Sequence, residues 1–147
     1  MNKEQALHLY VVLSRAYHSV AEADKKMIVT YGLSPSEFAV LELLLHKGPQ
    51  PIQYIASKVL LKSGSMTYVV TQLEKKKLLK RVVSSSDKRV FYAELTKKGE
   101  ALIKEIYPKH EEFLYNMMNI FSKEEAFTLS EQLKSLGKSL TNRKEVK

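Results

Sequence analysis

The residues with the clearest chemical potential lie in one stretch, residues 62–79, which reads KSGSMTYVVTQLEKKKLL. At helical spacing its apolar residues fall on one face, which can enter a core. Small, hydroxyl-bearing and cationic residues fall on the opposite face. Hydroxyl groups can bond base edges or phosphates, and cations can neutralise phosphates, so this face suits a helix that docks in a DNA groove. An ordinary amphipathic surface helix would show the same pattern.

Candidate DNA contacts occur on this predicted reading helix and in a basic hairpin predicted after it. On the helix they are Ser63, Gly64, Ser65, Thr67, Tyr68, Thr71 and Lys75, with Ser63 or Ser65 serving partly as a cap. In the hairpin they are Arg81, Asp87, Lys88 and Arg89.

Charge assigns different roles to these candidates. Lys75 and Arg81 are the preferred phosphate contacts in a basic run that also holds Lys76, Lys77 and Lys80. Such a run is also typical of a solvated face. Arg89 suits the narrow minor groove of A·T-rich DNA, with Asp87 orienting its guanidinium. The alternative for this pair is an exposed ion pair in a turn.

Helices must position the reading stretch. Apolar residues at helical period predict a first helix from residue 4 to about 30, closed by Gly32. Ser34, Pro35 and Glu37 predict a cap, a first helical position and a capping box for a leucine-rich core helix over residues 35–46. A short helix from residue 51 to about 59 then precedes the reading helix. Two short helices joined by so few residues indicate a helix-turn-helix.

The pattern after residue 79 alternates and predicts strands over residues 80–84 and 89–95, joined by a turn at 85–88. This hairpin would form a wing beside the reading helix. Thr96 should cap a further helix that continues past Pro108 with a kink. A capping box at Ser122 and Glu125 predicts a last helix to about residue 140.

Composition bounds the class of protein. The 147 residues fit one domain, and 24 Lys plus Arg against 16 Asp plus Glu give a net charge of +8, which favours a polyanionic partner. There is no cysteine, so thiol chemistry within the chain is excluded. No apolar run reaches the roughly 20 residues that span a bilayer, so we expect a cytoplasmic protein without a membrane partner. We expect no cofactor.

The sequence disfavours an enzyme or a metal sensor. It has no glycine-rich phosphate loop and no nucleophile motif around a serine. The four histidines, at positions 8, 18, 46 and 110, lack the spacing of metal ligands. Metal analysis of the purified protein would test a metal-sensing regulator built on them.

The order of elements resembles the MarR family of winged-helix transcription regulators over essentially the whole chain. Three segments carry the likeness: LSPSEFAVLELL, SGSMTYVVTQLEKKKLLKR and DKRVFYAELTKKG. Within the family, the chain is most similar to the branch that responds to quinones and related aromatic electrophiles. The resemblance implies a homodimer with interlocked terminal helices, bound to a pseudo-palindromic operator. Family members often carry arginine where Ser63 or Tyr68 stands here, so base readout would rely more on thymine methyls and DNA shape.

The resemblance also implies an effector pocket between the dimerisation helices and the DNA-binding lobe. Glu42 is a carboxylate within a leucine-rich helix, one turn after Phe38. Tyr10 and His110 could converge with them, giving an aromatic cavity able to bind a phenol or quinone oxygen. The alternative is that Glu42 is solvated and His110 lies on the surface.

We therefore predict a mainly α protein with a small β-hairpin wing, a single domain over residues 1–147. Dimerisation helices would lie at about 4–30 and 97–140, since their apolar stripes need a partner, and the winged helix-turn-helix at about 35–96. The terminal helices packing only on each other is the alternative. The predicted function is a homodimeric repressor of a double-stranded DNA operator, released by a small aromatic effector. A nonspecific architectural DNA-binding protein is the competing hypothesis.

Overall fold

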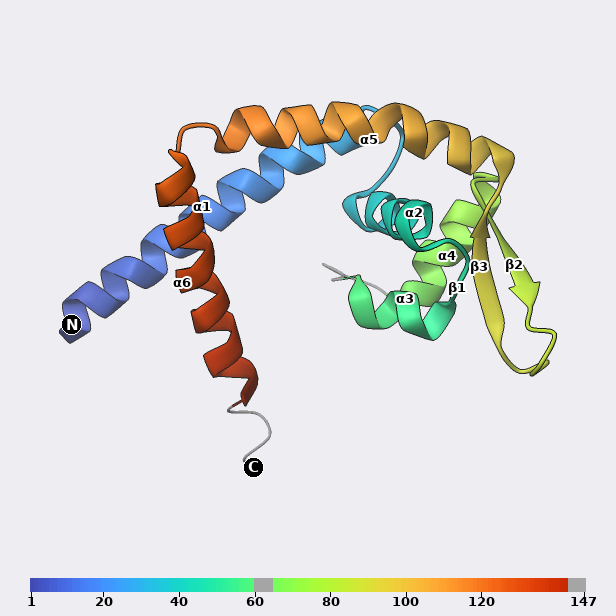
Figure 1. Ribbon diagram of the computed structural model, residues 1–147, viewed down its shortest axis with the longest axis horizontal. Coiled ribbons are helices and arrows are strands. Elements are labelled where there is room, and N and C mark those ends of the chain that lie inside the picture. Colours follow the sequence, from blue (N-terminus) through green and yellow to red (C-terminus); the bar gives the residue numbers. More distant parts are fainter. Residues whose placement is uncertain (60–64, 143–147) are drawn as a thin grey trace. The chain divides into compact units, whose positions relative to one another are not determined.

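The computed structural model describes residues 1–59 and 65–142 and falls into two compact units, Met1–His110 and Glu111–Lys147 (Figure 1). The predicted fold class is confirmed, because the described chain is mainly helical with one small antiparallel sheet. The elements in order are α1 (Lys3–Val29), α2 (Pro35–Lys47), β1 (Gln50–Pro51), α3 (Ile52–Lys58), α4 (Met66–Lys75), β2 (Leu79–Val83), β3 (Phe91–Leu95), α5 (Lys97–Met118) and α6 (Lys123–Asn142).

Several helix boundaries follow from caps that the sequence predicted. Gly32 has φ +73° after α1, and the Ser34 hydroxyl accepts a hydrogen bond from the Glu37 amide at the start of α2. Thr96 caps α5 by accepting from the Gly99 amide at 3.0 Å. The capping box of Ser122 and Glu125 is confirmed by both reciprocal bonds.

The capping box predicted for α2 is wrong in its second half. The Glu37 carboxylate does not return to the cap; it is buried and pairs with the Lys76 ammonium at 2.5 Å. The ion pair replaces the cap bond because the carboxylate, once buried, needs a cationic partner.

The reading helix is shorter than the predicted 62–79. It begins at Met66 and ends at Lys75, where the amides of Lys77 and Leu78 bond the Glu74 and Leu73 carbonyls. This is a Schellman closure, and Lys77 takes the left-handed position with φ +60°. The sequence offered no glycine there to signal the end of the helix.

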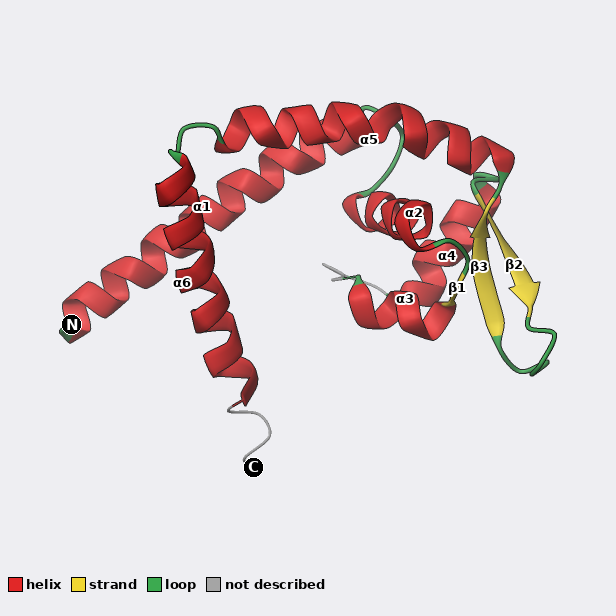
Figure 2. Ribbon diagram, in the orientation of Figure 1, coloured by secondary structure: helices red, strands yellow, loops and turns green. Residues whose placement is uncertain are grey.

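The sheet holds one strand more than predicted. Its order is β1-β3-β2, all antiparallel, with Leu79 opposite Leu95 and Val83 opposite Phe91 (Figure 2). β1 pairs Gln50 with Ala93 and has only two residues, too few for a periodic pattern. Arg89 lies in the turn, not in the second strand as predicted, because that strand begins at Phe91.

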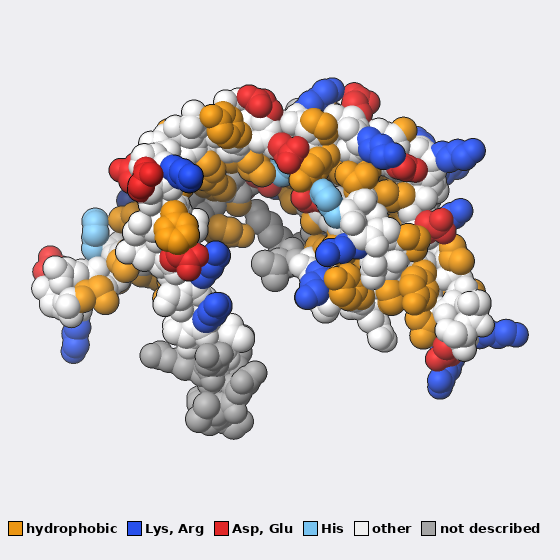
Figure 3. Space-filling view, viewed as in Figure 1, with side chains coloured by type: hydrophobic (Ala, Val, Ile, Leu, Met, Phe, Trp, Pro, Cys, Tyr) orange, Lys and Arg blue, Asp and Glu red, His pale blue; other side chains and the backbone are white. Residues whose placement is uncertain are grey.

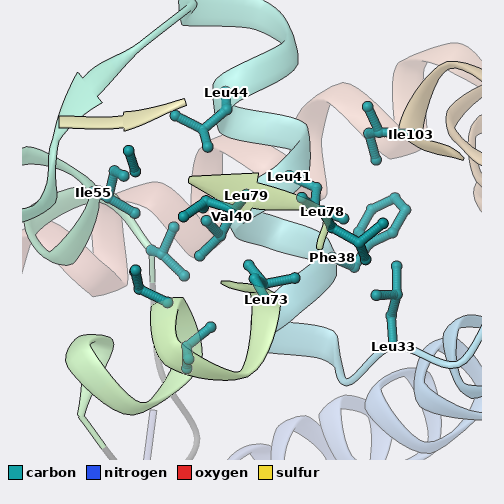
Figure 4. Close-up of a cluster of buried hydrophobic side chains, with 14 of the residues drawn as sticks. Leu33, Phe38, Val40, Leu41, Leu44, Ile55, Leu73, Leu78, Leu79 and Ile103 are labelled. Carbon is teal, nitrogen blue, oxygen red and sulfur yellow. The ribbon is translucent and has the colours of Figure 1, made fainter. Parts of the chain in front are cut away.

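The core of the first unit joins α2, α3, α4, the sheet and the start of α5. Phe38, Leu41, Leu73 and Ile103 are among its buried side chains (Figure 4). All four apolar residues of the predicted stripe on α4 are buried: Met66, Val69, Val70 and Leu73. The opposite face of α4 is therefore the one left for a partner.

The terminal helices have little core of their own. In α1 only Ile28 is buried, and none of the described side chains of α6 is. Figure 3 shows hydrophobic side chains at the surface of both helices. They include Leu7, Leu9, Tyr10 and Tyr17 on α1, and Phe127, Leu129, Leu133, Leu136 and Leu140 on α6.

Helix α5 continues through Pro108, as predicted. Among the described residues, no helix combines the length and apolarity needed to cross a bilayer.

Candidate nucleic-acid interface

The outward face of α4 carries the side chains that the sequence selected for reading DNA. Thr67, Tyr68 and Lys75 are exposed, with Tyr68 at 61%. The Ser65 hydroxyl accepts from the Tyr68 amide at 3.3 Å and so acts as the predicted cap. Ser63 and Gly64 lie outside the described residues. The helix thus offers hydroxyl groups and one cation on the side opposite its buried stripe.

Arg81 links the wing to this helix. It stands on β2 opposite the fully buried Ala93, so it projects from the sheet face that packs on the helices. Its Nε lies 2.9 Å from the Glu74 carboxylate, and its Nη2 donates to the Thr71 hydroxyl at 3.1 Å. The guanidinium is therefore engaged with two side chains of α4.

At the wing, Asp87 and Arg89 form an ion pair that is held by three hydrogen bonds. The Asp87 carboxylate accepts from the Arg89 amide at 3.0 Å, from Nε at 3.2 Å and from Nη2 at 3.2 Å. The Arg89 side chain, chiefly, and its amide hold the pKa of Asp87 below its ordinary value of 3.8. Arg89 is still 90% exposed, and Lys88 beside it is also exposed. The ion pair therefore orients a guanidinium that remains accessible to solvent.

The other cations of the basic run are mostly committed elsewhere. Lys76 bonds Glu37 and also the Gly32 carbonyl at 2.8 Å, so it ties the end of α4 to the α1–α2 turn. Lys80 lies 3.9 Å from Glu94. Lys76 is therefore not a free phosphate contact, whereas Lys75 has no hydrogen-bond or ion-pair partner among the described residues.

A tight junction joins the end of α4 to the start of α5. The Thr96 hydroxyl donates to the Lys77 carbonyl at 2.6 Å, and its amide donates to the Leu78 carbonyl at 3.2 Å. A Cβ on Gly99 would lie 1.9 Å from the Leu78 oxygen. Only glycine allows the backbone of α5 to come this close to the Leu78 carbonyl. The junction therefore holds the start of β2, and with it the wing, against α5.

The structure brings together only part of the predicted effector pocket. Phe38 and His110 are both buried, and their ring centroids lie 4.5 Å apart. His110 Nε2 lies 2.7 Å from the Asp24 carboxylate. The alternative that His110 lies on the surface is therefore wrong for this chain.

The other two pocket candidates stand differently. Glu42 is half-buried, and Tyr10 is 68% exposed. Tyr10 precedes Asp24 by fourteen residues on the same helix, a rise of about 21 Å, so the chain by itself does not bring it to His110. A cavity of about 250 Å³ in the same unit is lined by Leu44, Leu45, Gly48, Pro49, Glu94, Leu95 and Glu100 and contains none of the four.

Sequence reasoning missed Asp24, Glu74 and Glu37 as partners of His110, Arg81 and Lys76. Glu74 gave no periodic signal, because it lies on α4 and its partner Arg81 lies on β2. Asp24 and Glu37 meet partners 86 and 39 residues away and gave none. In the described ranges no group of three His, Cys, Asp or Glu side chains is placed to hold a metal ion.

Comparison with known proteins agrees with this geometry. The MarR family model matches residues 33–91. The HTH-type transcriptional regulator MhqR of Bacillus subtilis (strain 168) is 49% identical over 134 residues, covering 91% of this chain and 92% of that protein.

Solved structures share the fold. A MarR-like transcription regulator of Bacillus cereus ATCC 10987 aligns with a TM-score of 0.81 at 24% identity, over 93% of this chain and 99% of that one. Bordetella bronchiseptica BpsR, whose DNA binding is regulated by 6-hydroxynicotinic acid, aligns with a TM-score of 0.76 at 22% identity, over 88% and 98%. The chain belongs to the MarR family of winged-helix, DNA-binding transcription regulators.

Proposed function

We propose that this regulator is a homodimeric repressor of a pseudo-palindromic operator. The observation that carries the proposal is the division of α4 into a buried apolar stripe and an exposed hydroxyl-bearing face, beside a wing that presents Arg89. Each α4 would enter a major groove and each wing an adjacent minor groove, with the two half-sites about 34 Å apart. As a regulator of chromosomal DNA, it would work in the cytoplasm.

The exposed apolar side chains of the terminal helices support a homodimer in which each chain forms a single domain. Leu129, Leu133, Leu136 and Leu140 recur at the spacing of one helix face of α6, and each is 39–53% exposed. Apolar stripes of this kind are typical of surfaces that a partner covers. A second copy of the chain is a suitable partner, because α1 exposes large apolar side chains as well. The predicted dimerisation helices, residues 4–30 and 97–140, would together form the interface.

Release by a small aromatic effector, phenolic or quinone-like, completes the proposal. The similarity to MhqR and the sequence resemblance to the quinone-responsive branch support this class of ligand. Phe38 and His110, whose ring centroids lie 4.5 Å apart, are the two predicted pocket residues that the structure brings together. The chain has no cysteine, so the response would not use a thiol.

Sedimentation of the free protein and of its complex with a DNA selected from a random pool tests the dimer and the operator. Adding a phenol, a hydroquinone and a benzoquinone to the complex tests release. We expect Glu42→Gln or His110→Ala to alter release without weakening DNA binding in the absence of effector. If both variants respond like the parent, the pocket assignment is wrong.

A nonspecific architectural DNA-binding protein is favoured by one observation, the net charge of +8. A competition gel-shift at physiological salt separates the two functions. A repressor keeps its preference for the selected palindrome over random DNA, and an architectural protein does not.

A further inference from the structure

The Thr71 hydroxyl sits between the wing and the reading face. Arg81 Nη2 donates to its oxygen at 3.1 Å, while Arg81 Nε pairs with Glu74 at 2.9 Å. Thr71 and Glu74 are three residues apart and so lie on one side of α4. The guanidinium thus spans two residues of the helix from its place on β2.

The contact with Arg81 determines which hydrogen-bonding role, donor or acceptor, remains available to the Thr71 hydroxyl. A hydroxyl has one proton to donate and two lone pairs to accept with. Arg81 occupies one lone pair, and its positive charge disfavours a second donor at the same oxygen. The proton of Thr71 has no acceptor within the parts of the chain that are described, 1–59 and 65–142, so it is available to a ligand.

We propose that Arg81 is a positioning residue, which holds the Thr71 hydroxyl as a hydrogen-bond donor toward a base edge in the major groove. The inference rests on the proposed docking of α4. It replaces the phosphate contact predicted for Arg81 from the sequence, since Glu74 already neutralises the guanidinium. Arg81 would act on specificity through Thr71 and not by touching DNA.

The chemistry of base edges turns this into a sequence preference. In the major groove both purines present an N7 acceptor, but at the exocyclic position guanine O6 and thymine O4 are acceptors, whereas adenine N6 and cytosine N4 are donors. A hydroxyl held as a donor toward this exocyclic position prefers the keto bases, guanine and thymine, over the amino bases. At one position in each half-site, we expect a keto preference of about threefold to tenfold, the worth of one hydrogen bond.

Affinities for a set of single-base-pair substitutions of the selected operator test the proposal in full-length protein. Thr71→Val, which keeps the shape and removes the hydroxyl, should abolish the keto preference at one position. Thr71→Ser should keep it. Arg81→Met should relax the preference at that same position, and the double variant should be no worse than Thr71→Val, because the two side chains act as one unit.

Salt dependence separates positioning from a phosphate contact. A lost phosphate contact lowers the slope of log Kd against log salt by about one per subunit and weakens binding to all DNA evenly. We expect Arg81→Met to leave this slope unchanged. A reduced slope with an intact keto preference would overturn the proposal.

Two further arms keep the outcome decisive. If thermal melting shows that Arg81→Met does not fold, Arg81→Lys replaces it, because lysine keeps the charge but loses the fork that reaches Thr71 and Glu74. The keto preference should relax in this variant too, and full retention would contradict the inference. If Thr71→Val has no position-specific effect anywhere in the operator, the inference about Thr71 is wrong, whereas the docking of α4 is judged separately, by whether a common operator is recovered at all. If Thr71→Val acts at one base pair and the Arg81 variants do not, only the role of Arg81 is wrong.

Discussion

The region around α4 and the terminal helix α6 use the same kind of amphipathic sequence with opposite results. In α4 the whole apolar stripe is buried, with Val70 and Leu73 fully so. In α6 the apolar stripe remains exposed, and Leu140 reaches 53%. Helical period alone predicted both stripes. The difference is that α4 packs against the sheet, α2 and α3 within its own unit, whereas no element among the described residues packs against α6 to a comparable extent.

This contrast assigns the two regions different work. The α4 region is held by its own core and by side-chain ties such as Lys76 to Glu37, so it can present a reading face with fixed geometry. The α6 region is completed by another chain in the proposed dimer. Substitutions in the first region should act within one protomer, and those in the second should act through assembly.

The largest effect is expected from charging the α6 stripe. Leu133→Asp with Leu136→Asp would bury carboxylates in the proposed interface, where they have no partner, and should convert the dimer to monomer. Operator affinity should fall by about a hundredfold or more, because the two half-sites are then no longer bound as one unit. Sedimentation equilibrium and anisotropy measure the two effects.

The control for this variant is Lys134→Ala together with Glu131→Ala. These exposed residues form an ion pair on the same helix and should leave assembly unchanged. A charged-stripe variant that remains dimeric would move the proposed interface away from α6.

A matched pair of glycine substitutions compares the regions directly. Gly99→Ala places a methyl group 1.9 Å from the Leu78 carbonyl and should lower the free energy of unfolding by about 1–3 kcal/mol, since backbone must move. Gly137→Ala in α6 meets nothing within 4 Å and should raise it by about 0.5–1 kcal/mol through helix propensity. Urea unfolding of both variants checks the signs. Equal effects would remove the steric account of Gly99.

Arg89→Ala should weaken operator binding by about tenfold or more while the dimer remains intact. The side chain is 90% exposed and oriented by Asp87, as a minor-groove contact requires. Lys104→Ala, which removes an exposed cation paired with Glu100 on α5, is the matched charge control. Unchanged affinity of the Arg89 variant in a titration would refute the wing assignment.

Lys77→Gly should stabilise the fold by about 1 kcal/mol. Lys77 holds φ +60° at the end of α4, a conformation that costs a side chain with a Cβ and costs glycine little. Thermal and urea unfolding would detect the gain. A loss of stability would show that the lysine side chain contributes more than its backbone strain costs.

The smallest effect concerns acid titration of the wing. The pKa of Asp87 is lowered in the folded chain, so the contact with Arg89 is fully present above the ordinary value of 3.8 and is lost as pH falls through the folded value below it. Carboxyl NMR titration should show the pKa of Asp87 rising toward 3.8 in Arg89→Ala. If it does not move, Arg89 is not its cause.

Periodicity and caps predicted most of the fold. The stripe on α4, the Ser34 and Thr96 caps and the hairpin are local patterns, readable within one or two turns of chain. β1 was missed because two residues carry no period. The end of α4 was missed because Lys77 occupies a position that glycine usually signals.

The candidate site likewise contains residues that local sequence predicts and residues that only the fold brings together. The exposed residues of α4 and the ion pair of Asp87 and Arg89 could be predicted, because each depends on residues that are close together in the sequence. Lys75 was preferred over Lys76 as a phosphate contact, but the pairing of Lys76 with Glu37 could not be predicted, because the two residues are 39 positions apart. The link from Arg81 to Thr71 spans ten residues and two elements, so only the pairing of β2 beside α4 discloses it.

Selection of bound DNA from a random pool tests the central claim most directly, that two copies of α4 and its wing read one operator. We predict a recovered pseudo-palindrome with half-sites about one helical turn apart and A·T-rich flanks where the wings lie. Recovery of a single asymmetric site, or of no common sequence, would contradict it.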